Sequence, residues 1–261
     1  MNGQGIEIER AGPVATLWLC RPEARNAFDE ALVDALTAAL RALDDDDSVR
    51  VLVIGGRGTT FCAGADLEWM RRMAGYDEAA NLADAARLAQ MLHALATLSK
   101  PTIARVQGAA LGGGTGLVAA CDIAVATTEA RFGTTEVRLG LIPATISPYV
   151  IAAIGPRAAR HLFISGEHID AADAWRLGLV QQLCAPGDLD AAVAALAATL
   201  LQGAPGAQRA AKQLVADVAG QPLTPALLAE TSRRIAAARA SPEAREGIAA
   251  FFAKRKPGWA P

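Results

Sequence analysis

Four glycines within five positions, at 112, 113, 114 and 116, constrain this chain more than any other feature. They stand between an apolar run at 102–106 and an apolar stretch at 117–121, an order typical of a strand, a turn and a helix start. Because glycine costs about 1 kcal/mol relative to alanine inside a helix, the run is a large local deficit in stability. Such a deficit indicates that a ligand approaches bare N–H groups at a helix N-terminus. A flexible turn is the alternative interpretation.

Composition and charge exclude several classes of protein. The chain has 261 residues, 52% of them hydrophobic, which supports one large domain, or one domain with a small appendage. A net charge of −2 offers no general basic field for nucleic acid. The polar N-terminus at 1–10 has no apolar signal core, and no uncharged apolar run reaches about 18 residues. We therefore expect a soluble cytoplasmic protein with no nucleic-acid or membrane partner.

Residues that commonly carry metal or nucleophilic chemistry give weak leads. The cysteines at 20, 62, 121 and 184 have no metal-ligand spacing and no disulfide pattern, so we expect buried free thiols in a reducing compartment and no metal. The histidines at 93, 161 and 168 form no recognisable nucleophilic arrangement.

The order of expected elements predicts an α/β core followed by helices. Strands are expected at 6–9, 14–20, 49–54, 102–106, 122–126 and 180–184, with a loop at 61–66. Helices are expected at 30–43, 77–98, 114–120, 157–164, 171–176, 187–202, 205–218, 224–239 and 242–254, the first capped by Asp29. We divide the chain into a core at 1–200 and a helical C-terminal region at 201–261, which packs on neighbouring subunits.

Two loops, at 61–66 and 112–114, share one arrangement. Each follows an expected strand and precedes an expected helix, so each can aim a backbone N–H into a common cleft. Two such donors form an oxyanion hole for a thioester or acyl oxygen, and each donor contributes about 3–4 kcal/mol to the transition state in known cases. A phosphate-binding loop is excluded, because neither the Lys-Ser/Thr pair nor the dinucleotide pattern is present.

Glu136 is a candidate general base. It follows a short expected strand and has apolar neighbours, so burial can tune the pKa of its carboxyl. The alternative is a surface glutamate paired with Arg138.

Several ordered segments then accumulate along the chain. They are RPEARNA at 21–27, FCAGADL at 61–67, VQGAALGGG at 106–114, FGTTE at 132–136, LGLIP at 139–143 and FFAKR at 251–255. In this order and spacing the chain resembles the crotonase superfamily (enoyl-CoA hydratase/isomerase) over nearly its whole length. The resemblance implies a repeated ββα spiral core with a helical C-terminal trimerisation region, in a homo-oligomer that is a trimer or a dimer of trimers.

The resemblance also implies the chemistry of the site. The substrate is an acyl-CoA ester that passes through an enolate, and no separate cofactor is needed because coenzyme A is part of the substrate. By position, the backbone N–H groups of Ala65 and Gly113 hold the thioester oxygen, and Glu136 is the catalytic acid or base. The CoA path is implied at Ala24, Arg25, Ala63, Asp66 and Leu67, and, on a neighbouring subunit's CoA, at Phe251 and Lys254.

One departure from the family pattern bears on the reaction. Typical hydratases carry two glutamates, and Gly116 stands where the first is expected. Members of the bacterial methylglutaconyl-CoA and carboxygeranoyl-CoA hydratase branch can also lack it, and the segments 141–150, 154–160 and 241–259 resemble that branch. Its substrates are branched esters with a second carboxylate, for which Arg72 and Arg138 are candidate partners.

Three hypotheses follow from the resemblance. The first is hydration of a 2,3-enoyl-CoA thioester, a 3-methylglutaconyl-CoA-like branched ester. The second is Δ3-Δ2 enoyl-CoA isomerisation, which related enzymes perform with the glutamate that corresponds to Glu136. The third is a catalytically weak acyl-CoA-binding protein.

Overall fold

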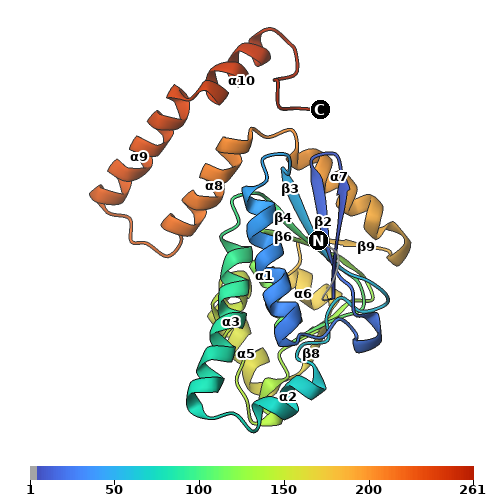
Figure 1. The fold of residues 1–261 in the computed structure, drawn as a ribbon. Helices are drawn as coiled ribbons and strands as arrows, with labels where there is room; N and C mark the ends of the chain where they lie inside the picture. The colour runs from blue at the N-terminus through green and yellow to red at the C-terminus, as the bar shows by residue number, and fades with distance from the viewer. Residues whose placement is uncertain (1–4) are drawn as a thin grey trace.

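The computed structural model describes residues 5–261 and contains two β-sheets with helices around them (Figure 1). The first four residues, part of the polar N-terminus discussed above, lie outside the described residues. The larger sheet has the strand order β1-β2-β3-β4-β6-β9. Its members are β1 (Ile6–Ala11), β2 (Val14–Leu19), β3 (Val51–Gly56), β4 (Thr102–Val106), β6 (Ile123–Thr127) and β9 (Gln182–Cys184). Within this sheet, as described over residues 5–261, β1 and β2 are antiparallel and the other neighbouring strands are parallel.

The smaller sheet creates a repeating path along the chain. It has the order β5-β7-β8, with β5 (Ala109–Leu111), β7 (Arg131–Gly133) and β8 (His168–Asp170). Each of β4 and β6 passes to a short strand of this sheet and then into a helix, first α4 (Gly113–Ala120) and then α5 (Ser147–Ser165). After β3 the chain bridges to the same sheet at Cys62 and continues into α2 (Leu67–Met73). The expected α/β class is therefore confirmed, with strand, strand and helix in repetition.

Helices cover both faces of the larger sheet, which is why every residue of β3 is buried. On one side α1 (Glu30–Asp45) packs against α3 (Glu78–Ala96), and the Asp29 carboxylate caps α1 as expected by accepting from the Leu32 N–H. On the other side α7 (Leu189–Leu200) packs on β4 and β6. The short helix α6 (Ala171–Leu177) follows β8.

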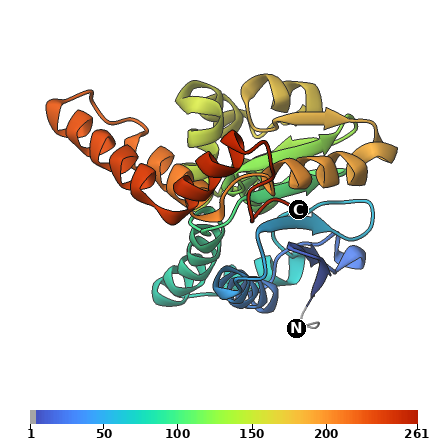
Figure 2. The same ribbon diagram turned by 90° about the horizontal axis from the view of Figure 1, so that it is seen from above.

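The C-terminal helices form an arm that extends from this core (Figure 2). They are α8 (Pro205–Val218), α9 (Pro225–Ala240) and α10 (Pro242–Phe252). The Arg50 guanidinium ties the arm to the core by donating to the carbonyl oxygens of Gly203, at 2.6 Å, and Trp259, at 2.7 Å. The expected helical C-terminal region is confirmed. The boundary between 200 and 201, packing on neighbouring subunits and the trimer stay predictions.

Four features differ from the sequence expectation. Helix α2 was not expected; the Asp66 carboxylate starts it by accepting from two backbone N–H groups of its first turn. Strands β5 and β8 are also absent from the sequence expectation, because their three residues each are too few for a clear alternation. Helix α5 begins at Ser147 rather than at 157, because two helical segments meet at Gly155, whose φ is +76°. Of the four cysteines expected to be buried, Cys62 is buried and Cys121 and Cys184 are half-buried, whereas Cys20 is exposed because it follows the last inward-facing residue of β2.

The cysteines and the helices bear on two further expectations. The thiols of Cys20, Cys62, Cys121 and Cys184 are all free. Within residues 5–261 no single helix is long and apolar enough to cross a membrane, although 186–200 and 205–218 pass such a test together across a bend of 101°. The cytoplasmic location stays a prediction.

Candidate active site

The two loops predicted to share a cleft lie against each other. The Cys62 N–H donates to the Ala109 carbonyl at 3.0 Å, and the Leu111 N–H donates to the Cys62 carbonyl at 2.9 Å. A Cβ placed on Gly64 would stand 3.0 Å from the Leu111 carbonyl oxygen and 3.9 Å from the Gly112 Cα. The backbone of the first loop therefore touches the backbone that leads into α4.

Close packing explains most of the glycine run. Gly112 has a φ of +51°, a region that side chains disfavour. A Cβ on Gly113 would stand 2.7 Å from the Phe28 ring, and one on Gly114 would stand 2.5 Å from the Cys62 carbonyl oxygen. The run is therefore a tightly packed turn in which side chains would clash with their neighbours, and the flexible-turn interpretation is wrong.

Two backbone donors face one cavity. Ala65 and Gly113 both line a cavity of about 420 Å³. Gly113 is the first residue of α4, where the N–H has no partner within the helix. Across the described stretch of the chain, neither the Ala65 N–H nor the Gly113 N–H has a hydrogen-bond acceptor. Both donors are available to a ligand oxygen, and the first turn of α4 favours negative charge there.

Glu136 lies on the same cavity, at the start of a short 3-10 helix (Glu136–Leu139). Its carboxyl packs on the glycine turn: Oε1 is 3.2 Å from the position that a Cβ on Gly112 would occupy. Its Oε2 is buried and has no hydrogen-bond partner among residues 5–261. Burial raises the pKa of this carboxyl above its ordinary value. No ion pair in the described part of the chain joins it to Arg138, so the surface-pair interpretation is wrong.

The residues predicted to contact CoA gather beside the first loop. The Ala63 N–H donates to the Arg25 carbonyl at 3.0 Å, which joins the 21–27 turn to the loop. The Asp66 carboxylate caps α2 and pairs with Arg21 at 3.1 Å. Ala24 is half-buried, Arg25 is exposed, and Leu67 is 69% exposed. Only Ala63 of the five CoA residues lines the cavity itself. Their role toward CoA stays a prediction.

Phe251 and Lys254 lie elsewhere. Phe251 is 78% exposed near the end of α10, and Lys254 is exposed just beyond that helix, on the arm that extends from the core (Figure 2). Neither lines the cavity of its own chain. Their predicted contact with the CoA of a neighbouring subunit is therefore untested.

The comparisons with known proteins decide the family. A sequence model described as "Enoyl-CoA hydratase/isomerase" matches residues 9–261. The chain belongs to the enoyl-CoA hydratase/isomerase family. It is similar to a putative enoyl-CoA hydratase of Thermus thermophilus, with 37% identity over 97% of this chain and 99% of the relative. It is also 38% identical to the 2,3-dehydroadipyl-CoA hydratase of Escherichia coli, over 96% of each chain.

Solved structures agree with this assignment. A putative enoyl-CoA hydratase/isomerase (crotonase) from Legionella pneumophila shares 44% identity over 98% of both chains, with a TM-score of 0.93. A Shewanella pealeana enoyl-CoA hydratase has a TM-score of 0.95 at 40% identity, over 98% of this chain and 96% of that one. The protein is thus an enzyme of the crotonase superfamily, and the branch within it is left open by these comparisons.

For this enoyl-CoA hydratase/isomerase, the structure shows what lies next to Gly116, the position at which the resemblance implies a first glutamate in typical hydratases. A Cβ placed on Gly116 would stand 2.2 Å from Cγ2 of Ile146 and 2.8 Å from its Cβ. Ile146 is 2% exposed and lines the cavity. A buried aliphatic side chain therefore fills the space next to position 116, which leaves Glu136 as the carboxyl beside the glycine turn.

Helices α2 and α3 line the cavity with residues that the sequence did not single out. Helix α2 contributes Trp69, Met70 and Met73, and α3 contributes Asn81, Asp84, Ala85 and Leu88. The α3 set has the i, i+3, i+4, i+7 spacing of one helical face, a signal that could have found it. The indole N–H of Trp69 donates to Oδ1 of Asp84 at 3.2 Å.

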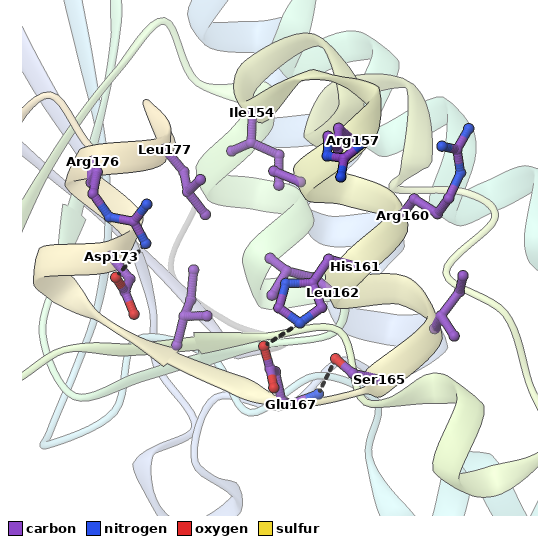
Figure 3. A pocket seen from close by; sticks show the side chains of 13 residues that line it. Ile154, Arg157, Arg160, His161, Leu162, Ser165, Glu167, Asp173, Arg176 and Leu177 are labelled. Atoms are coloured by element: carbon purple, nitrogen blue, oxygen red, sulfur yellow. Dashed lines mark hydrogen bonds and ion pairs between the residues drawn. The ribbon is translucent and has the colours of Figure 1, made fainter.

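Other potential centres lie apart from this site. A cavity of about 860 Å³ between α5 and α6 is lined by His161 and Glu167, which are 3.0 Å apart, and by the Arg176–Asp173 ion pair (Figure 3). None of the predicted catalytic or CoA residues lines it. Within residues 5–261 no group of three or more metal-ligating side chains gathers.

Proposed function

We propose that this enzyme hydrates a 2,3-enoyl-CoA thioester through an enolate. One observation carries the proposal: two backbone N–H groups that have no acceptor among residues 5–261 line the same cavity as Glu136, a carboxyl with one buried oxygen. When the thioester oxygen accepts from Ala65 and Gly113, negative charge that develops on this oxygen meets fixed donors. Each such donor contributes about 3 kcal/mol in comparable sites.

In the proposed reaction one carboxylate handles both proton transfers. Ionised Glu136 takes a proton from water as the hydroxyl oxygen bonds to C3 of the enoyl group. The electron pair of the double bond moves to the thioester oxygen and forms the enolate. Protonated Glu136 then gives its proton to C2 as the enolate collapses. Hydroxide and proton both come from one water molecule, so no second acid is needed in place of Gly116.

The proposed substrate is anchored by its CoA part. The turn with Ala24 and Arg25, and the loop with Ala63, Asp66 and Leu67, would hold CoA beside the two donors. Phe251 and Lys254 of a neighbouring subunit would complete this site in a trimer or a dimer of trimers. The exposed apolar side chains of the arm, among them Val215, Leu228 and Ile235, support such an assembly.

For the acyl part we propose a short branched ester similar to 3-methylglutaconyl-CoA. Apolar side chains supply most of the cavity wall, which suits a methyl branch. Neither of the two arginines considered for the second carboxylate lines the cavity; Arg72 pairs with Glu30 on the outside, and Arg138 is exposed. The recognition of that carboxylate therefore needs another group.

Isomerisation of a 3-enoyl-CoA is the second candidate, and the contact between Gly116 and Ile146 favours it. An isomerase needs one carboxylate that takes a proton from C2 and returns it to C4. Glu136 beside the two donors meets that need without any group to orient water.

One assay separates the candidates. Purified enzyme is given crotonyl-CoA, 3-methylglutaconyl-CoA and a 3-enoyl-CoA, and the loss or gain of enoyl absorbance is followed. The proposal predicts hydration of at least one of the 2,3-enoyl esters. If only the 3-enoyl ester is converted, the enzyme is an isomerase and the hydratase proposal is wrong. Saturable binding of all three esters without turnover would leave only an acyl-CoA-binding role.

A further inference from the structure

A polar patch interrupts the apolar cavity wall that α2 and α3 form. It consists of Asn81 and Asp84, three residues apart on one face of α3, with Trp69 of α2 beside them. Their neighbours on this wall, Met70, Met73 and Leu88, are apolar. A carboxyl on such a wall loses solvation unless a ligand or a partner compensates for it.

One oxygen of the Asp84 carboxyl is hydrogen-bonded within the protein, and the other is available to a ligand. The indole N–H of Trp69, a side chain that is 4% exposed, donates to Oδ1 at 3.2 Å. In the described part of the chain Oδ2 has no hydrogen-bond partner and no ion pair. One oxygen is therefore fixed by the protein, and the other is available to the contents of the cavity.

Burial favours the protonated form of Asp84. It raises the pKa of this carboxyl, and Glu30 on α1 raises it further, whereas the hydrogen bond from the Trp69 indole and the charges of Arg87 and Arg72 lower it. Of the described residues, Glu136 is the one other carboxyl that lines the cavity. Among residues 5–261, no lysine or arginine lines the cavity. A carboxylate that enters on an acyl chain would thus meet another carboxyl and no cation.

Two carboxyl groups in contact are stable when they share one proton, because both cannot be ionised at close range. We propose that Asp84 selects the acyl chain by sharing one proton with a carboxyl group at its far end, with Trp69 holding the other Asp84 oxygen and Asn81 beside the pair. The proton comes from solvent as the ester binds. This inference rests on the proposed function, since it concerns the acyl end of the same substrate.

Calorimetry with unreactive esters tests it without turnover. Glutaryl-CoA and valeryl-CoA have the same chain length, and only the first carries a terminal carboxylate. Binding of each is measured in buffers of different ionisation enthalpy between pH 6 and pH 8, which gives the protons taken up per site. We expect the binding of glutaryl-CoA to be accompanied by more proton uptake than the binding of valeryl-CoA, by up to one proton per site. Its affinity should fall up to tenfold per pH unit in the upper part of the range, whereas that of valeryl-CoA should not.

Two variants identify the residue. Asp84→Asn keeps an acceptor for the Trp69 indole and should abolish the difference in proton uptake between the two esters. Glu78→Gln, which removes an exposed carboxylate from the first turn of the same helix, should leave that difference unchanged. Equal proton uptake for both esters in the wild type, or an unchanged difference in Asp84→Asn, would overturn the inference. Hydration of crotonyl-CoA, which has no terminal carboxylate, would still support the proposed function in that case.

Discussion

The contact between Gly116 and Ile146 gives a prediction with a definite sign. Alanine at position 116 gains about 1 kcal/mol over glycine from helix propensity. Its Cβ would also stand 2.2 Å from Cγ2 of Ile146, and forcing an atom into a packed core costs about 1–3 kcal/mol. We therefore expect Gly116→Ala to lower the free energy of unfolding by up to about 2 kcal/mol, although the same change at an open helical site would raise it.

A double-mutant cycle isolates the contact. Ile146→Ala alone removes a buried side chain and should cost about 2–5 kcal/mol, but it deletes the atom at 2.2 Å and leaves only the Cβ at 2.8 Å. The double variant should be destabilised by about 1 kcal/mol or more less than the sum of the two single-variant costs. Urea unfolding followed by tryptophan fluorescence, at one protein concentration, measures all four corners. Additivity within about 0.5 kcal/mol, or a Gly116→Ala variant more stable than the wild type, would refute the reasoning.

Three further outcomes follow from groups outside this contact. Since burial raises the pKa of Glu136, the stability that its protonated form contributes is fully present below the ordinary value of 4.5 and is lost as the pH rises through the folded-state pKa. Glu136→Gln should thus be more stable than the wild type at pH 8 and equal to it near pH 4 in thermal unfolding. Exposed Cys20 should react rapidly with a thiol reagent and Cys62, whose pKa burial raises to about 12, should not; Cys20→Ser should remove the fast phase. Arg50→Ala should cost about 2 kcal/mol and speed proteolysis where the arm begins, because Arg50 donates to carbonyl oxygens of the arm.

Sequence periodicity predicted most long elements, though not the first half of α5, for a physical reason. In α1 the apolar residues at 32, 33, 36, 40 and 43 have helical spacing and are all buried, because a helix of four turns repeats its face often enough to be recognised. Strands β5 and β8 form because each pairs with β7, which is distant from both of them in the sequence. Three residues carry no readable period, so the smaller sheet could not be predicted from local pattern.

The features of the site also fall into two groups, those visible in the sequence and those that depend on tertiary packing. The two loops and Glu136 could be predicted because glycines and an isolated acid are visible in the sequence itself. The Trp69–Asp84 hydrogen bond joins two helices, and the Ile146 side chain beside Gly116 comes from another segment. Both depend on the packing of distant parts of the chain, which a single sequence does not display.

The central claim is that one carboxylate, Glu136, carries the proton of the reaction. The most direct test is the turnover number of Glu136→Gln on the enoyl-CoA ester that the wild type hydrates, with Glu167→Gln, a half-buried acid next to His161 and away from the active-site cavity, as the matched control. The account predicts a loss of about 10³-fold or more for Glu136→Gln, with unchanged ester binding, and near-normal turnover for the control. A Glu136→Gln enzyme within tenfold of the wild type would contradict it.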